Sequence, residues 1–208
     1  MLGLVHENGQ YNIMGTDFTH IYRNGNTAYS ALGEDAASGL VALYNLSTNS
    51  SRQDVGIAHW LYYGANGEYS RHSRTNLTNN TNGADLPFPE FGPKSIINFT
   101  GERIYKVLRG QTIKKQLIEN NGKSAQSGIF IKNYLSGDSN IKTGDTLLDT
   151  NTLPTIVRDM PYQYIASLTI PSSTPVGYYF LGAIIDPNNA LTEVHESNNV
   201  ATWAVHVQ

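Results

Sequence analysis

The feature that most constrains the fold is a period-two alternation of apolar and polar residues, which begins near residue 55 and recurs to the end of the chain. It is clearest in segments 177–185 and 200–207, where aromatic and β-branched residues are frequent. Because successive side chains of a strand point to opposite faces of a sheet, the alternation predicts strands with one buried face. The expected buried set is Tyr179, Leu181, Ala183, Ile185, Ala201, Trp203, Val205 and Val207.

Shorter runs of the same kind predict further strands, separated by clusters of Gly, Asn, Pro and Ser that are typical of turns. Two of these runs flank Gly64-Ala-Asn-Gly67, a sequence typical of a hairpin turn. The spacing of the turns predicts a mainly β fold class, with an immunoglobulin-like β-sandwich from about residue 96 to 208. The additional strands are expected at 55–63, 69–77, 104–108, 111–119, 128–135 and 164–170.

Charge and composition exclude several classes of function. The 208 residues carry a formal net charge of -3, so the chain has no basic excess for binding nucleic acid or an anionic membrane. No apolar run reaches the roughly 18 residues that a membrane-spanning helix needs. Cysteine is absent, which excludes disulfides, thiol nucleophiles and thiolate metal ligands.

Residues 34–44 are the one segment with helical periodicity, since apolar residues recur there at spacings of three and four. Acidic Glu34 and Asp35 stand at the start, where the helix dipole favours negative charge. The segment is therefore expected to form a short helix with one packed face. The polar run 45–51 follows without periodicity and predicts a domain boundary.

A motif for zinc chemistry lies near the N-terminus. Gly3 and His6 have the spacing of the last third of H-E-x-x-H-x-x-G-x-x-H, and Met14 follows His6 by eight positions. Residues 32–44 are similar to the pattern L-x-x-D-D-x-x-G-I-x-x-L-Y-G that closes matrixin catalytic domains. Taken in order, these features resemble the matrixin-like metzincins, a group of zinc metallopeptidases, over about the first 45 residues. Glu7, Gly15 and Ala36 depart from the matrixin pattern, and the His-Glu pair at residues 6 and 7 is closer to that of astacins.

The metzincin resemblance implies a role for each matched residue. His6 would be the third zinc ligand and Met14 the Met-turn beneath the metal, with Gly3, Glu7 and Asp35 as supporting motif positions. Two zinc-binding His residues and the catalytic Glu are missing from the chain, so it contains no catalytic residue of its own. We therefore expect neither tight zinc binding nor peptide cleavage by this chain, although an intact parent would hydrolyse protein or peptide substrates with zinc-activated water. Met1 is accordingly expected to be an internal residue mistaken for a start, as the favoured interpretation, or the start of the remaining tail of a decayed gene. On either interpretation the parent is a longer, secreted protein whose signal peptide precedes Met1.

A second resemblance covers about residues 100–208. The terminal pattern D-x-x-N-x-x-x-E-x-x-E-x-N-N, from Asp186 to Asn199, resembles the bacterial extracellular CARDB domain, together with the segments 135–138, 145–148 and 177–179. Such β-sandwich modules are appended to adhesion-like proteins and secreted hydrolases. The expected organisation is a metzincin remnant at 1–48, a connecting region with a β-hairpin at 49–98, and a CARDB-like sandwich at 99–208.

Two groups of residues have alternative interpretations. One is an oxygen-rich set that either binds calcium or, as the stronger interpretation, forms hydrogen bonds within tight turns. The other is a set of aromatic residues that either form a strip for sugar or peptide binding or lie partly in a core. The oxygen-rich set is Asp186, Glu193, Glu196, Asn198 and Asn199, and the aromatic set is Trp60, Tyr62, Tyr63 and Tyr69.

Two hypotheses of function follow from the sequence. The first is the C-terminal portion of a secreted zinc metalloendopeptidase, inactive in this form. The alternative is an extracellular binding or adhesion module that contacts a protein or a glycan, with a vestigial peptidase segment. Both place the chain outside the cell.

Overall fold

The structure is a computed structural model that describes most of the chain after residue 52. The first 52 residues, which contain the predicted helix and zinc motif, lie outside the described part. In the described part there is no α-helix, and the single helical turn is the 3-10 helix η2 (Glu196–Asn198). The described ranges are 53–58, 60–66, 69–74, 77–79, 81–87, 90–91, 103–114, 116–120, 122, 124–157, 162–193 and 196–208.

The largest sheet has six strands in the order β10-β9-β13-β14-β6-β5. At its centre, β13 and β14 pair antiparallel along their length, and β14 pairs parallel with β6. The two segments with the clearest alternation are β13 and β14, with the predicted bounds, so this prediction is confirmed. The strands are β5 (Glu90–Phe91), β6 (Arg103–Val107), β9 (Phe130–Ser136), β10 (Thr146–Thr152), β13 (Gly177–Ile185) and β14 (Val200–Val207).

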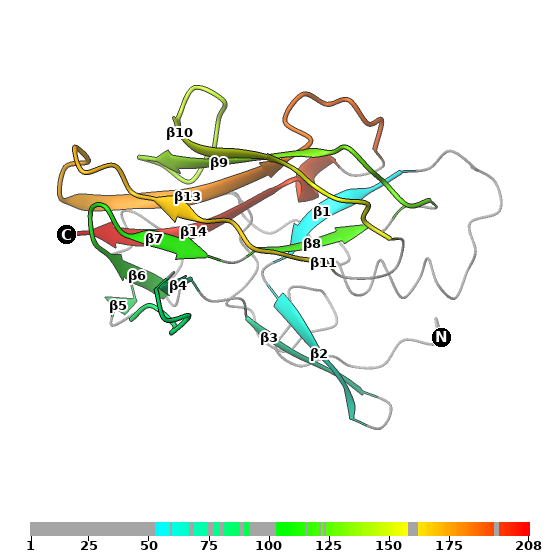
Figure 1. Cartoon of the computed structure of the whole chain (residues 1–208), viewed down its shortest axis with the longest axis horizontal. Coiled ribbons are helices and arrows are strands. Elements are labelled where there is room, and N and C mark those ends of the chain that lie inside the picture. The colour runs from blue at the N-terminus through cyan, green and yellow to red at the C-terminus, as the bar shows by residue number, and fades with distance from the viewer. Residues whose placement is uncertain are drawn as a thin grey trace.

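Two three-stranded sheets, in the orders β1-β8-β11 and β12-β7-β4, face the large sheet (Figure 1). The predicted strand 111–119 is divided between them, because β7 belongs to one sheet and β8 to the other. The strands are β1 (Val55–Ala58), β4 (Thr78–Asn79), β7 (Thr112–Lys114), β8 (Gln116–Asn120), β11 (Tyr162–Tyr164) and β12 (Leu168–Thr169).

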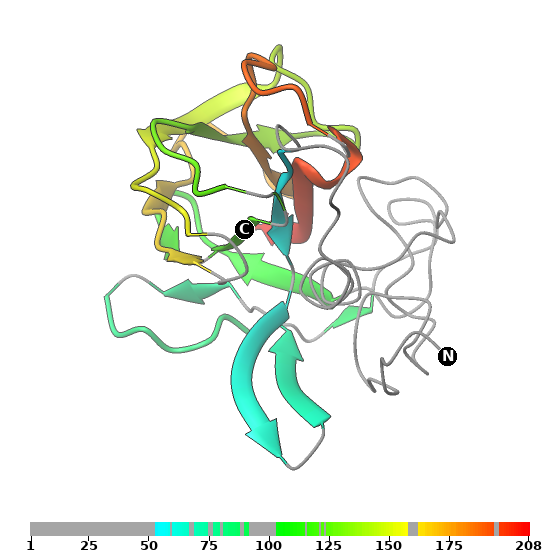
Figure 2. The ribbon, with the colours of Figure 1, turned by 90° about the vertical axis from the view of Figure 1, so that its right-hand side faces the viewer.

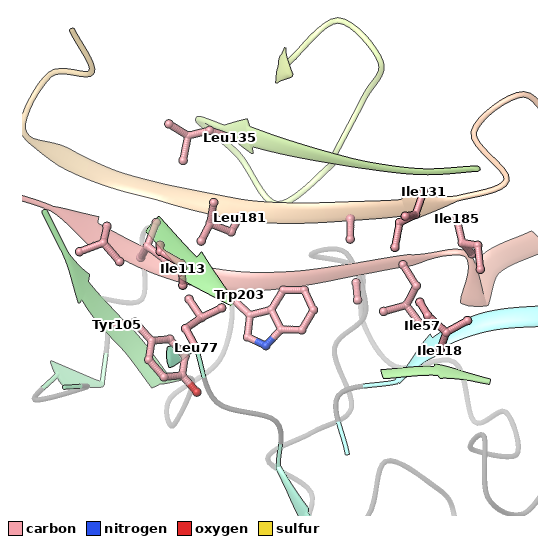
Figure 3. Close-up of a cluster of buried hydrophobic side chains, with 14 of the residues drawn as sticks. Ile57, Leu77, Tyr105, Ile113, Ile118, Ile131, Leu135, Leu181, Ile185 and Trp203 are labelled. Carbon is pink, nitrogen blue, oxygen red and sulfur yellow. The ribbon is translucent and has the colours of Figure 1, made fainter. Parts of the chain in front are cut away.

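One hydrophobic core fills the space between these layers. Trp203 of β14 is 2% exposed and lies near its centre, with Leu181 and Ile131 from neighbouring strands of the large sheet (Figure 3). Ile57 and Ile118 project into the same core from the facing sheet (Figure 3). Seven of the eight residues of the expected inward set are buried in this core, and Tyr179 packs half-buried against it. The mainly β, immunoglobulin-like fold class is confirmed with them.

The outer face of the large sheet is also partly buried, which alternation did not predict. Ile141, from the loop between β9 and β10, packs with Tyr134, Phe180, Ile104 and Ala204 in a second, smaller cluster. Edge strand β10 was not predicted either, because its seven residues are exposed or half-buried and have no alternating pattern.

Strands β2 (Trp60–Asn66) and β3 (Tyr69–Arg74) form a separate two-stranded sheet. This hairpin extends away from the sandwich in both views (Figures 1 and 2). It follows β1 closely, since β1 ends at Ala58 and β2 begins at Trp60. The hairpin was predicted, but the turn was placed too early: β2 continues through Gly64 to Asn66, with a bulge between Tyr62 and Ala65.

Candidate functional site

The zinc-related positions Gly3, His6, Glu7, Met14 and Asp35 lie outside the described residues, so their roles stay predictions. In the part of the chain that the structure describes, no three His, Cys, Asp or Glu side chains converge as a metal site. The same part contains no helix that is long and apolar enough to cross a membrane. The oxygen-rich set near the C-terminus lies within the described residues, whereas residues 194 and 195 beside it do not.

Asp186 organises the start of the connection between β13 and β14. It has a positive φ of 46°, a conformation that Asp tolerates better than most residues. Its Oδ1 accepts the backbone N–H of Ala190 at 3.1 Å, and its Oδ2 accepts that of Leu191 at 2.7 Å. Both carboxylate oxygens therefore hold the turn, as the turn interpretation expects.

Glu196 holds the second half of this connection. Its Oε1 accepts the backbone N–H of Glu193 at 3.3 Å, and its Oε2 accepts Nδ2 of Asn199 at 3.2 Å. With its amide nitrogen facing Glu196, Asn189 donates to both carboxylate oxygens at 3.0 Å. Glu196 is therefore also engaged in local hydrogen bonds.

Two other members of the set, Glu193 and Asn198, join this connection to the start of β1. Nδ2 of Asn198 donates to Oδ1 of Asp54 at 2.9 Å, between residues 144 positions apart. The backbone N–H of Val55 donates to Oε2 of Glu193 at 3.3 Å. Gly56 allows the close approach, because a Cβ there would lie 2.9 Å from Nδ2 of Asn198. We call the group formed by Asp54, Glu193, Asn198 and the adjacent Asn199, whose amide bonds Glu196, the β1 junction.

Three buried oxygens of the β1 junction have no hydrogen-bond partner among the residues that the structure describes. They are Oε1 of Glu193, Oδ1 of Asn198 and Oδ1 of Asn199. The two Asn residues are only 6% and 5% exposed, respectively. Unpaired buried acceptors are rare in folded proteins and costly, so this arrangement calls for a donor or a cation.

The pKa of the Glu193 carboxyl reflects its burial and the negative charge around it. Burial is the main cause that raises the pKa of its carboxyl to about 7 from an ordinary value of 4.5. The hydrogen bond from Val55 lowers the pKa in part. The neighbouring carboxylates of Glu196, Asp54 and Asp186 raise it further.

Sequence reasoning found Glu193, Asn198 and Asn199 but missed Asp54. Nothing in the local sequence around Asp54 marks it, because its partners come from a connection near the other end of the chain. The only signal was the start of an apolar strand at Val55, which did not indicate where that strand would dock.

The β2–β3 hairpin is the second place where the structure groups candidate residues. Trp60 lies opposite Arg74, and Tyr62 lies opposite His72. Residues directly opposite each other share a face of a sheet, as do alternate residues along a strand, so these four positions occupy one face. Of the other two predicted aromatic residues, Tyr63 adjoins the bulge and Tyr69 pairs with Asn66 near the tip.

The family described as CARDB matches residues 97–203 of the chain. That match contains Asp186, Glu193 and both Asn residues of the β1 junction, but not Asp54 or the hairpin. It begins well after residues 1–48, the segment for which the sequence predicted a peptidase remnant. No curated protein matches the sequence.

Several solved structures are distantly similar. A crystal structure of a CARDB domain from Pyrococcus furiosus, in complex with di-metal ions, has a TM-score of 0.44 and 16% identity, and covers 77% of this chain and 97% of that one. A solution structure of a CARDB domain from the same organism has a TM-score of 0.39 and 24% identity, over 49% of this chain and 84% of that one. A Niemann-Pick type C2 protein from the Japanese carpenter ant has a TM-score of 0.37 and 7% identity, over 75% and 95%.

Proposed function

Since this chain belongs to the CARDB family, with the matched region running from before β6 into β14, we propose that it is an extracellular binding module that contacts another protein. The family match over residues 97–203 is the observation that carries this proposal. The sandwich serves as a rigid support, and the projecting hairpin supplies the contact surface.

Residue types on the hairpin support a protein partner. Trp, Tyr and Arg are the residues that most often dominate the energy of protein interfaces. Trp60, Tyr62 and Arg74 are grouped on one face of the hairpin by its register. Strand β1 directly precedes the hairpin, and its Val55 and Ile57 are buried in the core, so the hairpin has a fixed base.

Binding to whole cells tests this function. Fluorescently labelled chain is added to intact cells of the organism that encodes it, and bound fluorescence is measured against concentration. The expected result is saturable binding that is lost when the cells are first treated with a protease that removes surface proteins. Binding that survives protease treatment but is lost after glycan digestion would instead indicate a glycan partner, and no saturable binding would contradict the proposal altogether.

A second candidate function is the tail of a metzincin peptidase, favoured by the spacing of Gly3, His6 and Met14. In this case the module would hold the peptidase near its substrates. Translation of the DNA directly upstream of the codon for Met1 tests it. An H-E-x-x-H motif whose second His immediately precedes Met1 is the expected result, and an upstream sequence without that motif would exclude the candidate.

A further inference from the structure

The three unpaired oxygens of the β1 junction belong to groups whose other polar atom is already fixed. Oε2 of Glu193 is held by the backbone of Val55, and Nδ2 of Asn198 is held by the carboxylate of Asp54. Nδ2 of Asn199 is held by the carboxylate of Glu196. Because the two polar atoms of an amide or carboxylate share one small planar group, each unpaired oxygen lies beside one of these contacts.

The surroundings of these oxygens are rich in acceptors and negative charge. Asp54 is buried, and Glu193 is half-buried with one oxygen fully enclosed. Rotation of either Asn amide to present its nitrogen here would break the hydrogen bond to Asp54 or to Glu196. These two hydrogen bonds therefore fix which atom of each amide, the oxygen, stays unpaired.

Oxygen ligands from carboxylates and amides, in irregular geometry, are the set that Ca²⁺ accepts, whereas Mg²⁺ demands a near-ideal octahedron and retains its waters. We propose that Glu193, Asn198 and Asn199 bind one divalent cation of the calcium class at the β1 junction, with Asp54 supplying further negative charge. Two of the three ligands are amides, so this site differs from a cluster of three acidic or His side chains, which the described residues do not contain.

A cation at this point has a structural consequence. It joins β1 to the β13–β14 connection, since Glu193 contacts Val55 and Asn198 contacts Asp54. The cation would therefore stabilise the base of the hairpin, whatever partner the module binds.

Calorimetric titration of the full chain with CaCl2, after removal of metals with EDTA and at about pH 7.5, tests the proposal. We expect one site per chain, weaker binding of Mg²⁺, and a melting temperature that rises with Ca²⁺ concentration because the ligand binds only the folded state. Glu193→Gln keeps the shape of the side chain but removes its charge, and should weaken Ca²⁺ binding at least about tenfold. Asp138→Asn is the matched control, because Asp138 lies in an exposed turn and accepts only a local N–H from Asn140; it should bind Ca²⁺ like the parent.

Two results would overturn the site. One is the absence of both binding heat and thermal stabilisation at Ca²⁺ concentrations up to about 10 mM, beyond the range of weak extracellular calcium modules. The other is a folded Glu193→Gln variant that binds Ca²⁺ like the parent. Stabilisation by acid alone, without any effect of Ca²⁺, would show that a proton on Glu193 rather than a metal satisfies the unpaired oxygens. The parent titration decides the matter even if the variant does not fold.

Discussion

At the scale of single residues, close contacts in the sandwich explain positions that have no obvious role in the sequence. Gly182 lies in the middle of β13, where a glycine normally weakens a strand. Ile141 lies directly over it, and a Cβ on Gly182 would collide with Cγ1 of Ile141. The glycine therefore makes room for the loop residue that covers the outer face of the large sheet.

Replacement of Gly182 by Ala tests this contact. The added methyl forces Ile141 out of its position, so the free energy of unfolding should fall by about 1 to 3 kcal/mol, as for other overpacked cores. Urea denaturation measures the change. Gly144→Ala is the control, since no atom of the described residues lies within 4 Å of its added Cβ, and it should unfold almost like the parent.

The pH dependence of stability follows from Glu193. Its folded pKa of about 7 is above the ordinary 4.5, so the folded state binds this proton more tightly than the unfolded state. The resulting stability is fully present below about pH 4.5 and is lost as the pH rises through about 7. The free energy of unfolding, measured by denaturation in EDTA at pH 5, 6, 7 and 8, should therefore lose this contribution as the pH rises. Glu193→Gln should flatten this decline, and equal slopes for parent and variant would show that Glu193 is not its source.

Residue types predicted the oxygen-rich set, but not which of its members bond within the local turns and which bond to β1. The carboxylate oxygens of Asp186 and Glu196 accept hydrogen bonds within local turns, as the favoured interpretation expected. Glu193 and Asn198 instead reach β1, which is distant in sequence. Spacing along the chain carries no information about such a contact, because it depends on which strand docks beside the connection.

At the scale of elements, the strands with one fully buried face were predicted best. Strands β13 and β14 have the predicted bounds because each alternates along its whole length. Edge strand β10 was missed because none of its residues is fully buried and its sequence does not alternate. The division of 111–119 into β7 and β8 was missed as well, since it reflects a change of sheet rather than a change of local pattern.

The hairpin gives a prediction at this scale. Trp60→Ala combined with Tyr62→Ala removes two aromatic side chains from one face, and should weaken binding to cells at least about tenfold if they are hot spots of the interface. The melting temperature should hardly change, because the hairpin is a separate sheet. Ser73→Ala is the control, as Ser73 lies opposite Leu61 on the other face. Undiminished cell binding by the double variant would place the contact surface elsewhere.

At the scale of the whole molecule, the sandwich extends beyond the family match. Strand β1 pairs with β8, and β4 pairs with β7, although both β1 and β4 precede residue 97. Composition and alternation predicted the β-sandwich itself, whereas the docking of these earlier strands could not be predicted from local patterns. The division of the chain into a connecting region at 49–98 and a sandwich at 99–208 stays a prediction.

The early strands and loops contribute to the core as well as to the sheets. Four of their side chains, Val55, Ile57, Leu77 and Leu86, belong to the same cluster as Trp203. Full burial of each such side chain contributes about 1.5 to 3 kcal/mol, and a domain's net stability is only about 5 to 15 kcal/mol. Loss of all four would therefore remove most of the stability of the sandwich.

In the proposed binding module, the hairpin is anchored in the sandwich through β1. The most direct test of this anchoring compares the equilibrium unfolding of the full chain with that of its fragment 97–208. The near-ultraviolet circular dichroism of Trp203, buried in the core, reports native packing. We predict a cooperative transition for the full chain, and for the fragment a much lower midpoint or no native signal at all. A fragment with the same midpoint and the same Trp203 signal would show that the sandwich is complete without β1, and would contradict this anchoring.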